Sequence, residues 1–517
     1  MDFINNPELV QASRSPPDLR KILTPERVAA FQTEAAGLRL LYGTERVTDS
    51  ILQALFEVAD HRQAVSQMKA MQEGVRVNAI QGYESENRPA LHTAMRDVFE
   101  ERSRTPVVQA AVHLAQKEIE KLKAFLPEVE KFTDIVQIGI GGSSLGPEAI
   151  YLGLEAYAPR GKRAHFISNV DPDEIAKVLG RLDLSKTLVV VVSKSGSTLE
   201  TVTNELLARE KLKNAGLNPK DHLIAVTGQG SPMDDPSKYR ASFYIWDYIG
   251  GRYSVTSMVG GVVLAFALGI ETYLQFLQGA HAMDRVALET DPHKNLPLLG
   301  ALLGIWNRNF LKYPTVAIIP YSQALARFPA HLQQLDMESN GKHINKEGKA
   351  VGYETGPVIW GEPGTNGQHS FFQLIHQGTN IIPLEIIGFE KTQYGEDLFV
   401  EGSTSQEKLL SNLFAQAIAL AQGQDNSNPN KVFTGNRPSH ILLAKRLDPF
   451  TMGTLLAYYE HKVVFQGFMW NINSFDQEGV QLGKKLATQM IKTFNEVREK
   501  QKPEYPLGEA YIHTLKF

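Results

Sequence analysis

The first quarter of the chain carries an apolar pattern with the period of an α-helix. Apolar side chains recur three or four residues apart up to about residue 130, and no strand-like run stands out. The pattern therefore predicts a helical segment. Its two clearest series are Val28, Phe31, Ala35 and Leu38, and Ile51, Leu52, Leu55, Phe56 and Ala59.

From Ile135 onward, short apolar runs alternate with amphipathic stretches. Runs that are apolar throughout are typical of strands covered on both faces, and their alternation with helices indicates a parallel sheet. The expected strands are 135–140, 164–168, 188–192, 222–226 and 243–246, with helices such as 171–181 and 198–213 between them.

A second α/β block follows an apolar helix at 254–270. Its expected strands are 315–319, 381–387 and 440–444, and its expected helices are near 366–377, 405–422 and 449–462. The chain closes with a helix from about 478 to 500 and a tail that contains proline. Related halves and independent blocks are both compatible with this pattern.

One stretch resembles a membrane span in length. Residues Tyr253 to Ile270 carry no charge and reach the lower limit for a spanning helix. Because the stretch contains serines, a threonine and glycines, and only Val262 to Ile270 is strongly apolar, we interpret it as a buried core helix. The first ten residues have no apolar core, so no signal peptide is expected and the chain reads as soluble.

Composition narrows the class of protein. At roughly 150 residues per domain, 517 residues suggest about three domains, and 43% hydrophobic with 21% charged residues is ordinary for a globular protein. The absence of cysteine excludes a disulfide scaffold, a thiol nucleophile and a Cys-ligated metal site. A net charge of −4 offers no field for nucleic acid or an anionic membrane, so any bound anion needs a local site.

Two loops at expected strand ends are suited to an anion. The first, Gly141 to Pro147, has glycines that let backbone amides approach a ligand, and it contains Gly142 and Ser143. A tight strand–helix turn is the plainer interpretation. The loop fails the dinucleotide pattern, because Ser144 stands where the third glycine belongs.

The second loop follows the strand at 188–192. Ser197 and Glu200 match a capping box, which predicts a helix start whose free N–H groups face the ligand. A polar turn is the alternative to an anion site. No P-loop pattern occurs, so the phosphate of a small metabolite suits the loop better than a nucleotide. The hydroxyls and the amine gathered there belong to Ser193, Lys194, Ser195, Ser197 and Thr198.

Four further residues are candidates for chemistry, each with a plainer alternative. Arg252 follows two glycines at a strand end, although an arginine is usually a surface ion-pair partner. Glu338 lies beside an Asn-Gly turn, and His369 sits at a helix entrance, where a proton-exchanging group is useful near pH 7. Lys484 lies two helical turns after Gln477, although such a lysine is normally solvated. No metal-ligand cluster appears, so no metal is expected.

Together these segments resemble the phosphoglucose isomerase family, the glucose-6-phosphate/fructose-6-phosphate isomerases of glycolysis and gluconeogenesis. The resemblance runs in order from about residue 40 to 500 and is highly specific. It rests on ENRPALHTAMR (86–96), IGIGGSSLGPEA (138–149), GGRYSVTS (250–257), QQLDMESNGK (333–342), GEPGTNGQHSFFQLIHQGT (361–379) and NSFDQEGVQLGKKLA (473–487).

The resemblance implies an α/β fold with two sugar-isomerase domains, each a five-stranded parallel sheet flanked by helices, and extra helices at both ends. The expected division is a helical segment at 1–115 that packs on the second domain, a first domain at 116–285 and a second domain at 286–517. It also implies a cytoplasmic homodimer in which His369 is contributed across the interface, with a sugar phosphate as substrate and no cofactor, nucleic acid or membrane partner.

The resemblance further implies a role for each candidate. Glu338 would move the proton between C2 and C1, Arg252 would stabilise the enediol oxygens, and His369 with Lys484 would open the sugar ring. The substrate would be bound by Gly142, Ser143, Ser193, Lys194 (mainly through its backbone), Ser195, Thr198, Gly251, Gln334 and Gln477.

Two departures from the family pattern stand out. Where the family commonly has threonines and an aromatic residue in the phosphate loop, this chain has Ser195, Gly196 and Ser197, so the hydroxyls remain and the aromatic residue is lost, which affects the rigidity of the loop. Glu478 stands where many members have tryptophan. A non-catalytic phosphosugar-binding regulator is the alternative, which would need the phosphate loop but not all four chemical residues. A third alternative is a sugar-phosphate enzyme of other chemistry. An aldolase would need a Schiff-base lysine, and an amidotransferase commonly uses a cysteine nucleophile, which this chain lacks.

Overall fold

The structure is a computed structural model that describes residues 3–515, and the chain divides into two compact units, one ending at Ser474 and one starting at Phe475. The first unit contains two large sheets and a two-stranded ribbon, β3 (Arg76–Asn78) and β4 (Arg88–Pro89). The second unit contains the short helix η12 (Glu478–Val480) and the helices α19 (Gln481–Arg498) and α20 (Pro506–Ile512), of which the last two pack on each other. The predicted division at residues 115 and 285 stays a prediction.

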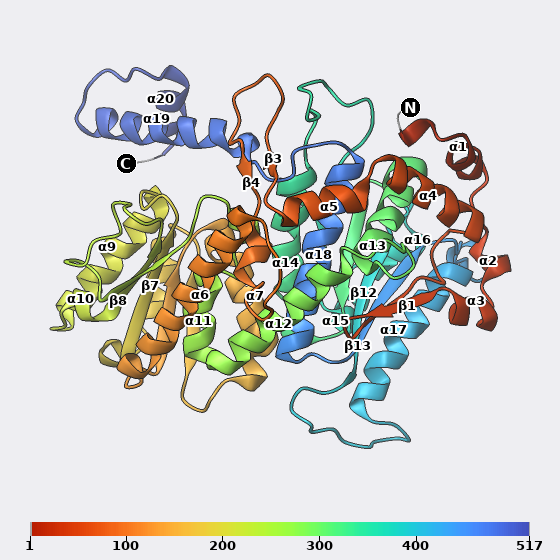
Figure 1. Ribbon diagram of the computed structural model, residues 1–517, viewed down its shortest axis with the longest axis horizontal. Coiled ribbons are helices and arrows are strands. Elements are labelled where there is room, and N and C mark those ends of the chain that lie inside the picture. Colours follow the sequence, from red (N-terminus) through yellow and green to blue (C-terminus); the bar gives the residue numbers. More distant parts are fainter. Residues whose placement is uncertain (1–2, 516–517) are drawn as a thin grey trace. The chain divides into compact units, whose positions relative to one another are not determined.

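The first large sheet has the strand order β6-β5-β7-β8-β9, and every pair in it is parallel. All five predicted strands are confirmed to within two residues. Every residue of β7 is buried, because helices cover both faces of the sheet (Figure 1). The strands are β5 (Asp134–Ile138), β6 (Arg163–Ile167), β7 (Thr187–Ser193), β8 (Leu223–Thr227) and β9 (Ala241–Tyr244).

Helices α8 (Pro172–Leu179) and α9 (Leu199–Asn214) cover one face of this sheet. Ile175 and Leu212 of these helices share a hydrophobic core with Val136 and Val189 of the strands. Helix α11 (Met258–Leu268) covers the other face, where the side chain of Gln137 in β5 donates to the carbonyl oxygen of Val259 at 3.2 Å. This arrangement leaves the carboxyl ends of β5 and β7 as the place where loops meet.

Helix α11 belongs to the stretch that resembled a membrane span. In the described part of the chain, only the window Gly251–Leu268 is long and apolar enough to cross a membrane, and 94% of it is buried inside the protein. Every residue of α11 is buried. The prediction of a core helix is therefore confirmed.

The second sheet differs from the prediction of five parallel strands. Its order is β1-β2-β13-β12-β10-β11, and only β10 to β13 run parallel. The fifth place is taken by β2, which pairs antiparallel with β13 and with β1. The strands are β1 (Gln32–Ala35), β2 (Leu38–Leu41), β10 (Thr315–Pro320), β11 (Val358–Trp360), β12 (Leu384–Lys391) and β13 (Ser439–Arg446).

The hairpin β1–β2 also corrects the prediction that the N-terminal segment is helical without strands. Residues 32–41 form two strands joined by Ala36 and Gly37, both with positive φ (49° and 74°), as a tight two-residue hairpin turn requires. The burial of β2 alternates, with Leu38 and Leu40 in the core. The series Val28, Phe31, Ala35 and Leu38 is therefore not one helix face.

Helices cover the second sheet as well. On one face, Phe372 of α16 (Phe372–Gln377) and Leu413 of α17 (Ser405–Gln422) pack against Ile319 and Ile386. The predicted helix at 366–377 is two short helices, and the predicted helix at 449–462 extends to Met469. The remaining helices are α1 (Pro7–Arg14), α2 (Leu19–Ile22), α3 (Pro25–Ala30), α4 (Asp49–His61), α5 (Ala64–Gln72), α6 (Pro106–Phe125), α7 (Leu145–Leu154), α10 (Pro219–His222), α12 (Ile270–Val286), α13 (Leu296–Ile305), α14 (Phe328–Gln333), α15 (Gly364–Gln368) and α18 (Pro449–Met469).

The two sheets share a strand order around their first strand. In each, the first strand of the parallel series (β5 or β10) lies between the second (β6 or β11) and the third (β7 or β12). The order in which strands are added to each sheet thus reverses beside its first parallel strand, β5 in one sheet and β10 in the other. Ligands of open parallel sheets bind at such points, beyond the carboxyl ends of the strands.

Candidate functional site

An ion pair between Arg252 and Glu338 forms the centre of the candidate site. Arg252 lies in the short helix η7 (Gly251–Tyr253), and Glu338 ends the π-helix η10 (Gln334–Glu338). Arg252 Nη1 donates to Glu338 Oε1 at 2.7 Å, and the two side chains are 0% and 25% exposed. A guanidinium wholly removed from water thus stands against a carboxylate that solvent can reach.

Gln334 orients the other oxygen of this carboxylate. Its Nε2 donates to Glu338 Oε2 at 3.1 Å along the same π-helix. The wider turn of a π-helix brings residues four apart onto one side, and such turns occur often at functional sites. The predicted site residues Arg252, Gln334 and Glu338 are therefore together.

Two glycine loops meet beside this pair. The short helix η4 (Gly141–Ser143) follows β5, and a Cβ at Gly142 would lie 2.2 Å from the carbonyl carbon of Gly251. Gly141 has a φ of +57°, and its Cβ would lie 3.2 Å from Gln334 Nε2. Only glycine allows this approach, so the two loops present their backbone next to Arg252. The structure brings the predicted residues Gly142 and Gly251 into direct contact.

The second predicted loop leads from β7 into α9. The hydroxyl oxygens of Ser193 and Thr198 are 3.0 Å apart, and Ser197 Oγ donates to Ser195 Oγ at 3.1 Å. Gly196 has a φ of +67°, which turns the chain so that the hydroxyls of the loop lie near one another. The structure therefore brings Ser193, Ser195 and Thr198 together at the amino end of α9.

The predicted capping box of Ser197 and Glu200 is wrong. Helix α9 starts at Leu199 with Thr198 as its N-cap residue, and no side chain caps this end within the described chain. The Thr198 hydroxyl instead pairs with Ser193. The first N–H groups of α9 are thus left to another acceptor, which is the condition for anion binding at a helix start.

Lys194 connects the two halves of the site. Its Nζ donates to the carbonyl oxygen of Ile249 at 3.1 Å, just before the glycines that precede Arg252. Burial lowers the pKa of Lys194 to about 8, with the neighbouring charge of Arg88 as a further cause. The amine is thus engaged with the backbone of the Arg252 loop, while the backbone of Lys194 belongs to the loop after β7.

The roles of three further predicted residues stay predictions. His369 is exposed, in the break between α15 and α16. Lys484 is exposed on α19 and Gln477 is half-buried, and both belong to the second unit. Ser143 completes η4 next to the contact of Gly142 with Gly251.

Sequence reasoning missed Ser339 and Tyr253, both buried against Arg252. Arg252 Nε donates to Ser339 Oγ at 2.6 Å, and the hydroxyls of Ser339 and Tyr253 are 2.9 Å apart. The only signal was their position next to Glu338 and Arg252 in the chain. Across residues 3–515, no group of three or more His, Cys, Asp or Glu side chains could hold a metal ion.

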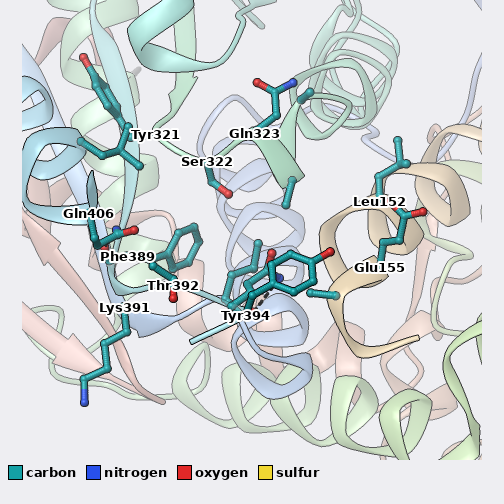
Figure 2. Close-up of a pocket in the computed structure, with 16 residues that line it drawn as sticks. Leu152, Glu155, Tyr321, Ser322, Gln323, Phe389, Lys391, Thr392, Tyr394 and Gln406 are labelled. Atoms are coloured by element: carbon teal, nitrogen blue, oxygen red, sulfur yellow. Dashed lines mark hydrogen bonds between the residues drawn. The ribbon is translucent and has the colours of Figure 1, made fainter. Parts of the chain in front are cut away.

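A separate cavity of about 520 Å³ lies at the matching edge of the second sheet. Figure 2 shows Ser322 and Gln323 after β10 and Thr392 and Tyr394 after β12, with Lys391 extending away from the other labelled side chains. Two of its side-chain amides already have partners: Gln393 Nε2 donates to the carbonyl oxygen of Gly153 (2.7 Å) and Gln406 Nε2 to that of Phe389 (2.5 Å). The cavity contains none of the predicted site residues.

The chemistry of the Arg252–Glu338 centre is limited by its groups. A carboxylate can remove and return a proton, and a fixed guanidinium beside it can stabilise an oxygen that gains negative charge. A cluster of hydroxyls and an open helix start can hold a phosphate. The combination fits proton transfer on a small phosphorylated carbonyl compound.

Comparison with known proteins identifies the relatives of this chain. The sequence profile of the family Phosphoglucose isomerase matches residues 41–504. A glucose-6-phosphate isomerase of Protochlamydia amoebophila (strain UWE25) is 58% identical over 513 residues, covering 98% of this chain and 96% of the relative. One of Chlamydia pneumoniae is 57% identical over 471 residues, covering 91% of this chain and 90% of the relative.

A solved structure agrees with the fold. The crystal structure of a glucose-6-phosphate isomerase from Chlamydia trachomatis D/UW-3/Cx superposes with a TM-score of 0.95 at 51% identity. The match covers 98% of this chain and 97% of that chain. That relative therefore shares the architecture of this chain over nearly the whole length.

Proposed function

The chain belongs to the phosphoglucose isomerase family, and on that premise we propose that it is an enzyme that interconverts glucose 6-phosphate and fructose 6-phosphate. The reaction belongs to glycolysis and gluconeogenesis. It transfers a proton between C1 and C2 of the ring-opened sugar through a cis-enediol and is redox-neutral within one molecule. We place the enzyme in the cytoplasm.

The observation that carries the proposal is the Arg252–Glu338 pair. Glu338 is the base that takes the proton from one carbon and returns it to the other, because its carboxylate is reached by solvent and oriented by Gln334. Arg252 stabilises the oxygen that gains charge, since its buried guanidinium is already in place. A positioned general base of this kind is typically worth about 10²–10⁴-fold in rate.

The phosphate of the substrate binds at the loop after β7. The hydroxyls of Ser193, Ser195 and Thr198, the backbone of Lys194 and the open start of α9 are the donors, with Ser143 nearby. The amides of Gly142 and Gly251 approach the sugar. Gln334 and Gln477 line the pocket. Gly196 stands where the family commonly has an aromatic residue, but the hydroxyls around it remain. We therefore expect the loop to keep its binding chemistry.

Ring opening falls to His369 and Lys484 by acid–base transfer. We propose that the enzyme is a homodimer in which His369 of the partner subunit completes each site. The exposure of His369 in a break between two short helices supports this, because it leaves the imidazole available to a neighbour.

A mixed dimer tests the exchange of His369. Co-expression of Glu338→Gln and His369→Ala chains with two different tags yields a heterodimer with one intact site if His369 acts across the interface. We expect that heterodimer to have about half the wild-type activity, while each homodimer is inactive. An inactive heterodimer would place His369 in its own subunit, and a monomer by chromatographic mass would remove the exchange altogether.

The activity itself is tested by a coupled assay. Purified protein with fructose 6-phosphate, a glucose-6-phosphate dehydrogenase and a chelator should produce NADPH without added metal or cofactor. Absence of turnover would instead favour the alternative, a non-catalytic phosphosugar-binding regulator. The relatives named above are glucose-6-phosphate isomerases, which supports the enzyme over that alternative.

A further inference from the structure

Each nitrogen of the Arg252 guanidinium donates to a partner. Its Nη1 donates to Glu338, its Nη2 to the carbonyl oxygen of Ser474 at 2.7 Å, and its Nε to Ser339 Oγ at 2.6 Å. The bond at Nε acts together with the bonds at the two Nη atoms to fix the plane of the group, because rotation about the Cδ–Nε bond would break all of them. The proposed mechanism assigns no role to Ser339.

Ser339 is itself held in place. Its side chain is wholly buried, and its hydroxyl lies 2.9 Å from that of Tyr253, whose ring stacks on His92 with ring centres 4.7 Å apart. Burial raises the pKa of Tyr253 to about 12, so the phenol stays neutral. Lys342 Nζ donates to the carbonyl oxygens of Glu338 (2.8 Å) and Ser339 (3.0 Å), which holds the end of the π-helix.

We propose that Ser339, braced by Tyr253, is a positioning residue for the isomerisation, whose hydroxyl fixes the plane of the Arg252 guanidinium. Electrostatic stabilisation depends on a donor that is in place before charge develops. If the guanidinium can rotate, it loses part of its interaction with the enediolate oxygen. Its bond to Glu338 is then disturbed as well, and with it the position of the base. This inference rests on the proposed function and adds a residue to it.

Ser339→Ala removes the acceptor of Arg252 Nε, so one of the bonds that fix the plane of the guanidinium is lost. We expect kcat to fall about 10- to 100-fold, since misplacement by about 1 Å can cost 100-fold, while KM changes less than threefold because the phosphate loop is untouched. Tyr253→Phe keeps the stacked ring and removes only the brace, so we expect a smaller fall in kcat of about three- to tenfold.

Two probes separate positioning from general damage. A hydroxamate analogue of the enediolate, carrying the same phosphate, should bind Ser339→Ala more weakly by the factor lost in kcat. Sorbitol 6-phosphate, which has the phosphate but no anionic oxygen at C1 or C2, should bind as it does to the wild type. Calorimetry on each folded variant gives both constants.

Ser439→Ala is the matched control. Ser439 is equally buried, its hydroxyl lies 3.1 Å from that of Thr44, and it starts β13 away from the site. We expect its kcat to stay within twofold of the wild type. The proposal is overturned if Ser339→Ala and Tyr253→Phe match this control, or if both probes weaken together. An active wild type in the same assay shows that such a failure concerns Ser339 and not the proposed function.

Discussion

The two sheets share a strand order, but the loops at their carboxyl edges are built differently. After β7, which ends at Ser193, a short loop with three more hydroxyl side chains enters α9, whose start has no side-chain cap. After β12 a long loop, 392–404, enters α17, whose start is closed by the capping box of Thr404 and Glu407. In both helices a Glu follows a hydroxyl residue three positions later, Glu200 after Ser197 and Glu407 after Thr404. Only the pair at the start of α17 forms a capping box.

The difference shows how one topology is used for two tasks. The open start of α9 can accept a phosphate, whereas at α17 the carboxylate of Glu407 already occupies that place. The chain near the second sheet instead supplies the π-helix with Glu338. We therefore expect binding of the charged group to depend on the first edge and removal of the proton to depend on Glu338, which follows β10.

The largest effect should come from removing the base. Glu338→Gln keeps the shape and the contact with Arg252 but cannot take a proton, so kcat should fall about 10²- to 10⁴-fold. Calorimetry should show that sorbitol 6-phosphate still binds within about threefold of the wild type. Equal loss of turnover and binding would mean that chemistry and binding are not divided between the two edges.

A pair of threonine variants tests the two helix starts directly. Thr198→Val removes one phosphate donor, and because a hydrogen bond to a charged group is worth about 1.5–3 kcal/mol, KM should rise about 10- to 100-fold. Thr404→Val removes the cap of α17 and should cost about 1 kcal/mol of unfolding free energy with KM unchanged. A similar rise in KM for both variants would contradict the distinction between the edges.

The turn at Gly196 should have an intermediate effect. Gly196→Ala forces a side chain into a φ of +67°, at about 1–2 kcal/mol, and its Cβ would lie 2.9 Å from Ser231 Oγ and 3.0 Å from the amide nitrogen of Met233. We expect lower stability and a KM raised severalfold. Gly216→Ala has a similar φ of +75° with nothing within 4 Å, so thermal unfolding should show the backbone cost alone with normal KM.

The smallest effect concerns the buried amine of the first edge. The pKa of Lys194 is lowered to about 8, against about 10.4 in the unfolded chain, so between these pH values only the unfolded chain keeps the proton. The unfolding free energy of the wild type should therefore rise with pH relative to Lys194→Met, by about 1–2 kcal/mol from pH 7.5 to 10 after solvent screening. Denaturant titrations at both pH values measure it. Lys391→Met, at an exposed lysine, is the control. If the unfolding free energy of the wild type rises with pH equally relative to this variant, the effect does not come from the buried amine of the phosphate loop.

Much of the first sheet could be read from the pattern of apolar residues, because its strands are buried on both faces and separated by helices. The hairpin of residues 32–41 could not, since four alternating positions in β2 are too few to outweigh a helical spacing of Val28, Phe31 and Ala35. Its partner strand β13 is remote in the sequence. Pairing between distant segments has no local signal.

The site shows the same division. Residues on loops after strands, such as Gly142, Ser193 and Arg252, are predictable because the topology collects them at one edge. The capping box at Ser197 failed, because the hydroxyl of Thr198 found Ser193 across the loop and the helix began one residue later than the pattern implies. The contact of Ser339 with Arg252 depends on a π-helix, which no apolar period reveals.

The place of β2 in the second sheet also has a consequence for synthesis on the ribosome. The hydroxyl of Thr44, just past β2, bonds to Ser439 at the start of β13, 395 residues later. At roughly 5–20 residues per second, the hairpin waits about 20–80 s for this partner to be made. The first sheet, complete by Tyr244, can fold meanwhile. The strands translated first are therefore among the last to reach their place, and the nascent chain must keep an unpaired edge from other chains until then.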